Sequence, residues 1–251
     1  MSGHSHWATI KRKKGASDAK KGAVYTRLAR EIAMSARAGG GDPESNFSLR
    51  LAIEKARTEN MPKDSIERAI KRGTGENKDG TVLEEMKYEG YAPHGVALII
   101  ECVTENRNRT VAELRHALSR AGGNLGESGS VAWQFRQAAY FAVPDTGDNF
   151  DKVFELAVEG GADDVQTDGE TIEIIAPVEN FKTMIDTMRK AKITPEEAKL
   201  RMLPNQEMEL EVSPTIQVIH TIETLEELDD VQNVYSNLRF SDEAMAALES
   251  N

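Results

Sequence analysis

The residues best suited to chemistry are cations near the start of the chain. The stretch IKRKKG places four of them side by side, and more follow in segments with helical apolar spacing. Four adjacent like charges repel one another until phosphates or counterions neutralise them, so such a run is typical of a segment that binds a polyanion. A solvated tail that only aids solubility is the alternative. We predict that the following residues bind nucleic acid: Lys11, Arg12, Lys13, Lys14, Lys20, Lys21, Arg27, Arg30, Arg68, Lys71 and Arg72.

The charge of the whole chain hides this concentration, because the 251 residues have a formal net charge of -11. Residues 1–78 hold 17 Lys and Arg against 9 Asp and Glu, a net of +8. Residues 79–251 hold 14 against 33, a net of -19. Such asymmetry favours a chain of which one part meets a polyanion while the rest stays soluble.

The acidic remainder has two readings. Clusters of carboxylates are most often a solvated face, and we expect this of Glu226, Glu227, Asp229 and Asp230. An acidic face could also bind a basic protein partner, and the sequence does not decide between the two.

A second candidate anion site lies in the stretch NRNRT. Arg107 and Arg109 stand near a predicted helix N-terminus, where backbone amides and the helix dipole favour an anion. The alternative is that both pair with the nearby Glu101 or Glu105.

No arrangement of residues predicts catalysis. The Gly-rich stretch GGNLGESGS lacks the Lys-Ser/Thr ending of a phosphate-binding loop and follows a helix, so we interpret it as a tight turn. A hydrolase that uses its Ser128 or Ser130 is kept as an alternative. The histidines His94, His116 and His220 lack the spacing of a zinc site, and we expect neither metal nor cofactor.

The single cysteine and the lack of long apolar runs bear on location. Cys102 lies in the apolar stretch GVALIIECVT, which predicts a small buried residue in a reducing compartment. No apolar run reaches the roughly 20 residues that a bilayer requires. We therefore expect a cytoplasmic protein with no membrane partner.

Three short amphipathic helices are predicted to carry the first group of cations. Their apolar stripes are Val24, Leu28 and Ile32, then Leu49, Ile53 and Ala56, then Ile66, Ala69 and Ile70. The stretch GGGDPES separates the first two helices, and Asp42 is expected to cap the second. The helices should form a bundle with a basic exterior.

Strands and helices are predicted to alternate in the rest of the chain. The expected strands are VALIIECVT, SVAWQF, AAYFAVP, TIEIIAPV and VQNVYSNLRF. Thr110 and Glu113 have the spacing of a capping box that opens a helix. A later helical stripe contains Phe150, Val153, Phe154, Ala157 and Val158. The fold class is thus α+β: an N-terminal three-helix bundle plus two small α/β domains, each a sheet with helices on one face.

Four long stretches resemble the YebC/PmpR family of probable transcriptional regulators: GHSHWATIKRKKGASDAKKG, NMPKDSIERAIKRGTG, YEGYAPHGVALIIECVTENRNRTVAELRH and GGNLGESGSVAWQF. The resemblance implies a helical domain at 1–78, an α/β domain at 79–136 with 206–251, and an inserted α/β domain at 137–205. His94 stands where the family commonly has a glycine, and His6 where it usually has a lysine.

The resemblance also implies nucleic-acid binding, since members have been assigned to promoter binding, mitochondrial relatives to translational activation and bacterial ones to the ribosome. We predict a non-enzymatic regulator that binds promoter DNA through residues 1–78. A ribosome-associated translation factor that binds ribosomal RNA is the alternative.

Overall fold

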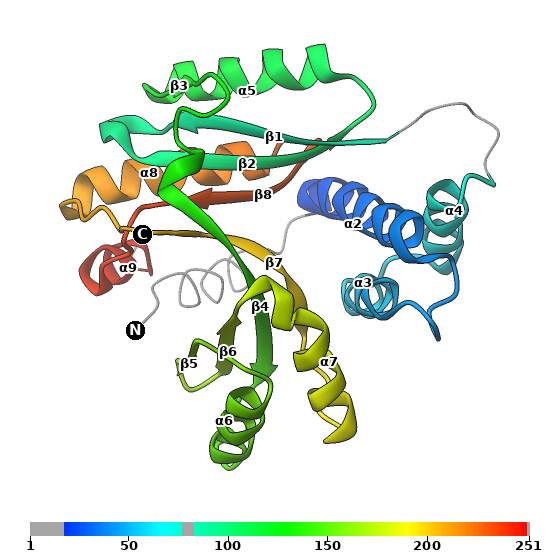
Figure 1. The fold of residues 1–251 in the computed structure, drawn as a ribbon. Coiled ribbons are helices and arrows are strands. Elements are labelled where there is room, and N and C mark those ends of the chain that lie inside the picture. The colour runs from blue at the N-terminus through cyan, green and yellow to red at the C-terminus, as the bar shows by residue number, and fades with distance from the viewer. Residues whose placement is uncertain (1–17, 77–82, 250–251) are drawn as a thin grey trace.

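The computed structural model describes residues 18–76 and 83–249 (Figure 1). The predicted cations Lys11, Arg12, Lys13 and Lys14 lie outside the described residues, as do the side chains of Lys20 and Lys21.

Three helices form the first part: α2 (Asp18–Gly39), α3 (Phe47–Thr58) and α4 (Lys63–Gly73). Their apolar stripes meet in one core, because each stripe recurs at helical spacing on a single face. This confirms the predicted three-helix bundle. Its buried members include Leu28, Ile32, Leu49, Ile53, Ala56, Ile66 and Ala69.

The second of these helices begins later than predicted. Asn46 caps α3, and its side chain accepts a hydrogen bond from the Leu49 amide at 3.1 Å. Asp42 instead holds the preceding turn by accepting the Glu44 amide at 3.0 Å. The expected cap at Asp42 is therefore wrong: both residues are good caps, and the turn at Pro43 delays the helix start.

The first sheet has the strand order β3–β1–β2–β8, and every neighbouring pair is antiparallel. Its strands are β1 (Glu84–Tyr91), β2 (Ala97–Thr104), β3 (Asn124–Leu125) and β8 (Val231–Ser236). The helices α5 (Arg107–Ala121) and α8 (Val212–Glu226) cover one face, and α9 (Asp242–Glu249) packs against α8. Alternate residues of β2 reach these helices: Leu98, Ile100 and Cys102.

The second sheet has the order β5–β6–β4–β7, also antiparallel. Its strands are β4 (Phe135–Pro144), β5 (Asp164–Thr167), β6 (Thr171–Ala176) and β7 (Glu197–Pro204). The helices α6 (Phe150–Glu159) and α7 (Phe181–Lys190) pack on one face around Phe141, Ile172 and Ile174. The predicted α+β class, with two helix-covered sheets, is confirmed.

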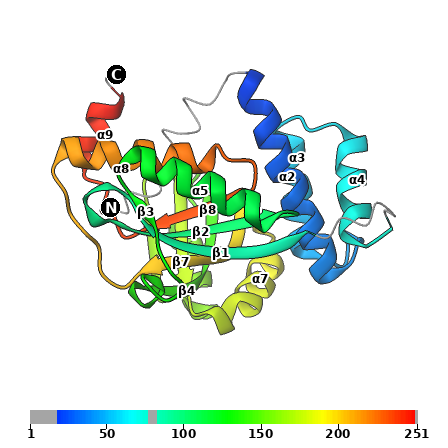
Figure 2. The same cartoon turned by 90° about the horizontal axis from the view of Figure 1, so that it is seen from above.

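The two sheets touch through the face of β2 that the helices leave open. Ala97 and Ile99 pack there with Val131 and Phe135, and Met202 of β7 lies against the same cluster. In chain order, the second sheet lies between β3 and α8, as Figure 2 shows from above. The predicted domain boundaries, at residues 78/79, 136/137 and 205/206, stay a prediction.

Two local expectations in this region are wrong. The helix α5 starts at Arg107 and is capped by Asn106, which accepts the Arg109 amide at 3.1 Å, so Thr110 is not a cap. The stretch SVAWQF is not a strand, because a 3-10 turn occupies Ala132–Gln134 and β4 begins only at Phe135.

Backbone geometry explains one departure from the family pattern. His94 has φ of 63°, in the left-handed region that favours glycine. Its ring nitrogen Nε2 lies 2.8 Å from Oε1 of Gln217 on α8. The histidine therefore has a strained backbone conformation, and its side chain makes a contact between the η1 turn (Pro93–Gly95) and α8.

The cysteine is buried as predicted. Cys102 is 1% exposed in β2, and burial raises the pKa of its thiol to about 12. Across residues 18–76 and 83–249, no helix is long and apolar enough to cross a membrane.

Candidate nucleic-acid interface

The helix α4 presents two of the predicted cations to solvent. Arg68, Lys71 and Arg72 are spaced by three and four residues, so they share one side of the helix. The exposed Arg68 donates to the Asp64 carbonyl at 3.2 Å and to Ser65 Oγ at 3.0 Å. Lys71 is exposed and makes no ion pair with any described residue. Arg68 and Lys71, here called the α4 cations, are therefore accessible to a phosphate.

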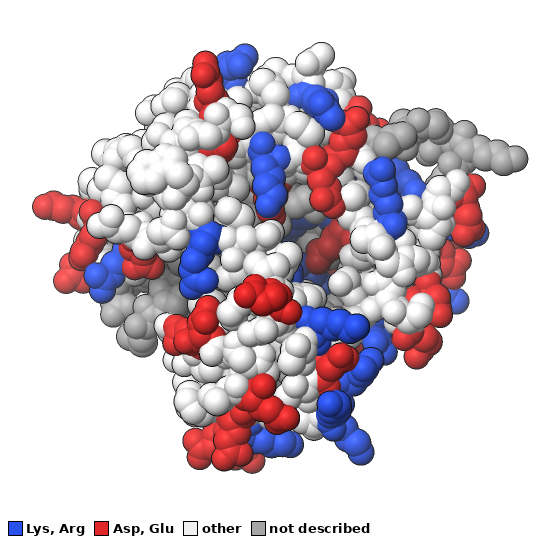
Figure 3. All heavy atoms as spheres, in the orientation of Figure 1, with Lys and Arg blue, Asp and Glu red and all other residues white. Residues whose placement is uncertain are grey.

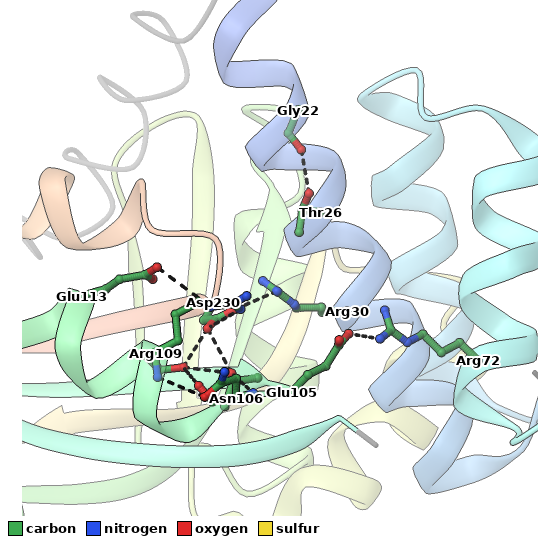
Figure 4. A network of polar contacts seen from close by, with 11 residues as sticks. Gly22, Thr26, Arg30, Arg72, Glu105, Asn106, Arg109, Glu113 and Asp230 are labelled. Atoms are coloured by element: carbon green, nitrogen blue, oxygen red, sulfur yellow. Dashed lines mark hydrogen bonds and ion pairs between the residues drawn. The ribbon is translucent and has the colours of Figure 1, made fainter. Parts of the chain in front are cut away.

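The third of these cations, Arg72, points toward the first sheet. Its guanidinium pairs with Glu105, which follows strand β2 (Figure 4). This contact joins the helical bundle to the first sheet. On α2, Arg27 is partly exposed, and Arg30 is buried.

Arg30 reaches Asp230, which precedes β8 and is 1% exposed. The Arg30 guanidinium nitrogen Nη2 donates to Asp230 Oδ1 at 2.7 Å. The carboxylate also accepts Arg109 at 2.8 Å and the hydroxyl groups of Thr110 and Thr104 at 2.7 and 3.0 Å. These five residues, the Asp230 cluster, bring together α2, the end of β2, the start of α5 and the start of β8 (Figure 4).

The surroundings keep Asp230 ionised. Burial alone raises the pKa of a carboxyl group, but the hydrogen bonds from Thr110, Arg109 and Thr104 and the charge of Arg30 outweigh it. The pKa of Asp230 therefore lies below its ordinary value. A buried charge with four donors around it holds its neighbours in fixed positions.

The predicted anion site at the start of α5 is occupied by carboxylates of the chain itself. Arg107 pairs with Glu84, and Arg109 pairs with Asp230 and, at 3.9 Å, with Glu113. The pairing alternative describes the structure, although the partners are not the expected Glu101 or Glu105. Arg107 and Arg109 thus stabilise a joint in this structure.

Four of the predicted cations therefore converge, but on a junction instead of an open surface. Arg30, Arg72, Arg107 and Arg109 each meet a carboxylate where the bundle contacts the first sheet. The sequence analysis missed Asp230 as the centre of this junction and wrongly expected it on a solvated face. The local sequence does not distinguish Asp230, because the adjacent residue Asp229 is of the same type and is exposed.

The exterior of the described bundle is less basic than predicted. Residues 22–76 hold ten Lys and Arg against eight Asp and Glu, a net of only +2. Figure 3 accordingly shows blue and red spheres mixed over the face it presents. Most of the positive excess belongs to residues 11–21, which hold six cations and one carboxylate.

The backbone amides at the end of the Gly-rich turn are already occupied by a carboxylate of the chain. The amide of Gly129 and those of the following residues Val131 and Ala132 donate to the Glu89 carboxylate at 2.7, 2.7 and 2.8 Å. Burial raises the pKa of Glu89, but these three hydrogen bonds outweigh it and hold the pKa below its ordinary value. The donors that a phosphate would need are taken, as the interpretation of GGNLGESGS as a turn requires.

Among the described residues, neither Ser130 nor a cluster of metal-ligating side chains forms a catalytic or metal site. The Ser130 hydroxyl is buried without a hydrogen-bond partner, so no base activates it. Within the described ranges, no three His, Cys, Asp or Glu side chains are placed to hold a metal ion.

The fold and this junction define the class: an α+β protein with two sheets covered by helices and a helical bundle that ion pairs, one of them buried, join to the first sheet. A family model described as the TACO1/YebC protein N-terminal domain matches residues 5–76, and one described as the TACO1/YebC second and third domain matches residues 83–238. The chain belongs to the TACO1/YebC family, which confirms the resemblance inferred from the sequence.

Named relatives span the whole chain. A "Probable transcriptional regulatory protein" of Geotalea uraniireducens is 49% identical and covers 98% of each chain. One of the same name from Acidithiobacillus ferrooxidans is 50% identical over 100% of this chain and 99% of its own. The crystal structure of a conserved hypothetical protein from Aquifex aeolicus superposes with a TM-score of 0.83 at 41% identity, covering 94% of this chain and 98% of that one.

Proposed function

We propose that this chain is a non-enzymatic regulator of transcription that binds promoter DNA through residues 1–78. The observation that carries the proposal is the concentration of charge: residues 11–21 hold six cations and one carboxylate in a chain of net charge -11. The names of the full-length relatives support the same reading.

The accessible cations of the bundle extend this surface. The α4 cations Arg68 and Lys71 are exposed, and Arg27 is partly exposed on α2. Figure 2 shows the first turns of α2 at the outer edge of the molecule, beyond the helices that cover the first sheet. A duplex bound at this edge avoids the acidic remainder of the chain. Arg30 takes no part in the proposed surface, since it is buried against Asp230.

The salt dependence of binding tests the electrostatic part. Each phosphate bound by a cation contributes a slope of about 0.9 to the fall of log affinity with log salt concentration on duplex DNA. Replacing Lys11, Arg12, Lys13 and Lys14 by Ala should reduce the slope by about 0.9 for each phosphate that the variant no longer neutralises. An unchanged slope would remove this segment from the interface.

A pair of matched double variants tests the bundle. Arg68→Ala with Lys71→Ala should weaken DNA binding and reduce the slope by up to about 1.8. Lys182→Ala with Lys190→Ala removes two exposed lysines of α7 and should change neither quantity. Equal losses in both doubles would show that net charge alone determines binding.

Selection from a pool of random duplexes, compared with a matched pool of RNA, tests the function itself. A regulator of transcription should enrich particular duplex sequences. Equal affinity for every duplex would refute promoter recognition, and enrichment of RNA alone would replace it with the translation-factor reading.

A further inference from the structure

Two apolar side chains on α6 face solvent, contrary to the sequence pattern. Phe154 is 45% exposed and Val158 is 58% exposed, although both belong to the apolar stripe predicted for this helix. The buried side of α6 is formed by Val153 and Ala157, which are 1% and 0% exposed. The stripe is thus wider than the core requires, and two of its five members lie outside the core of the second sheet.

The exposed pair forms one surface, because residues four apart are neighbours on a helix. The Phe154 ring is held against Phe150, with ring centroids 6.1 Å apart. Three exposed carboxylates of α6 lie one or three residues from a member of the pair. We call this surface the α6 patch: Asp151, Phe154, Glu155, Val158 and Glu159.

The surroundings of the patch are strongly acidic. Residues 144–170 hold nine Asp and Glu and a single cation, Lys152, a net charge of -8. Red spheres gather at the lower end of the molecule in Figure 3, where Figure 1 places α6. The three carboxylates of the α6 patch make no ion pair with a described residue, whereas Asp163 lies 3.8 Å from Arg136.

The negative charge around the α6 patch indicates which kind of partner can bind there. Nucleic acid and anionic lipid are both repelled by the net charge of -8 on residues 144–170. A second copy of the chain would place its own carboxylates against those of the first. An apolar pair with an acidic rim complements a partner that has apolar side chains among lysines or arginines.

We propose that the α6 patch is a docking site for a basic protein segment that inserts one or two apolar side chains between flanking Lys or Arg residues. The site is independent of the proposed nucleic-acid surface, since it lies on the second sheet and has the opposite charge. The chain would then hold a polyanion at one end and a basic protein at the other.

Two synthetic peptides test the proposal on the full chain. One is a 14-residue helical peptide of Lys and Leu with the leucines on one face, and the other has Ser in place of each Leu. At physiological ionic strength, the Lys/Leu peptide should bind at least tenfold more tightly than the Lys/Ser peptide. Equal affinities would refute the apolar part of the site.

Matched variants locate the binding. Phe154→Ser with Val158→Ser should weaken binding of the Lys/Leu peptide at least tenfold, and Asp151→Lys with Glu155→Lys should do the same. Trp133→Ser is the control, because Trp133 is a 73% exposed apolar side chain outside α6. An equal loss in the control, or none in the α6 variants, would overturn the proposal.

Measurements on the unmodified chain test the proposal without depending on variants that could misfold. Backbone amide chemical shifts should move along α6 when the Lys/Leu peptide is added, and shifts confined to other elements would refute the site. Self-association that is abolished by Phe154→Ser with Val158→Ser would make a second copy the occupant. A tenfold gain in peptide affinity on neutralising Lys11, Arg12, Lys13 and Lys14 would make the chain's own basic run the occupant.

Discussion

Replacing Asp230 by Ala tests how much the junction between the bundle and the first sheet contributes to the stability of the chain. The substitution removes a carboxylate that is 1% exposed and accepts hydrogen bonds from four side chains. Arg30, at 9% exposure, would keep its charge without a partner. Removing one member of a buried pair typically costs about 3–5 kcal/mol, because the remaining charge is desolvated and uncompensated.

Most of this cost comes from Arg30. The Arg109 side chain is 49% exposed, so water replaces its carboxylate partner and its share stays below about 1 kcal/mol. The two threonine hydroxyls add little, because they keep the hydrogen bond between them at 2.9 Å and Thr110 keeps the Asn106 carbonyl at 3.1 Å. We expect Asp230→Ala to lower the free energy of unfolding by about 3–5 kcal/mol in total.

Urea unfolding followed by circular dichroism measures this loss, with the m-value as a check that the transition is comparable. Asp229→Ala is the matched control, since Asp229 is the adjacent carboxylate and is exposed. It should change stability by less than about 0.5 kcal/mol. A loss below about 1 kcal/mol for Asp230→Ala, or a loss equal to the control, would refute the view that Asp230 holds the bundle on the sheet.

The pH dependence of a second substitution at this position, Asp230→Asn, has a definite sign. The pKa of Asp230 is lower in the folded chain than in the unfolded chain, so its contribution is complete above about pH 4 and is lost as pH decreases through the folded pKa. The difference in Tm between the unmodified chain and Asp230→Asn should therefore shrink when the pH is lowered from about 7 to about 3. A constant difference would contradict the lowered pKa.

Three further predictions concern the first sheet. Glu89→Gln should speed amide exchange in its turn about tenfold, since three hydrogen bonds to a carboxylate become weaker or are broken, and unchanged exchange would refute this. Gly123→Ala should cost about 1–3 kcal/mol in urea unfolding, because its Cβ would meet the Tyr91 carbonyl oxygen at 2.3 Å, whereas Gly22→Ala, with open space around it, should not destabilise the chain. Cys102, buried and with a pKa of about 12, should react with a thiol reagent only after unfolding, and fast labelling of the native chain would contradict its burial.

Elements with one-sided apolar spacing could be predicted from the sequence. The three helices of the bundle each repeat an apolar residue at helical spacing, and glycines end α2 and α4. The strand β2 is apolar from residue 97 to residue 100 because both of its faces are covered there. In such segments, local pattern and tertiary burial agree.

Other elements were missed. The edge strand β7 was not predicted, although residues 197–202 alternate polar and apolar side chains, which is the signal that could have found it. Ala198 and Leu200 pack against the core of the second sheet, and Met202 packs against the cluster between the two sheets. The short helix α9 near the end of the chain was also not predicted, and it packs against α8.

The candidate site shows the same limit more sharply. Runs of cations could be read from the sequence, but whether each meets a phosphate or a carboxylate depends on contacts across the fold. Arg30 and Asp230 are 200 residues apart, so no spacing rule joins them. The exposed Phe154 and Val158 were predicted only as members of an apolar stripe, and the structure shows that this stripe has an inner and an outer part.

Under the proposed function the Asp230 cluster has a role beyond stability, because it fixes α2, the helix that residues 11–21 lead into along the sequence. At physiological ionic strength the Debye length is about 8 Å, so the net charge of -19 on residues 79–251 acts on a phosphate only over short distances. It does oppose any duplex that lies along the sheets. If residues 1–78 bind a polyanion as proposed, a joint that holds α2 in one orientation would select the surface that the polyanion reaches, and a buried ion pair suits this role because it specifies geometry more than it adds stability. On this reasoning, breaking the Arg30–Asp230 pair should leave the cations in place and still alter where nucleic acid binds.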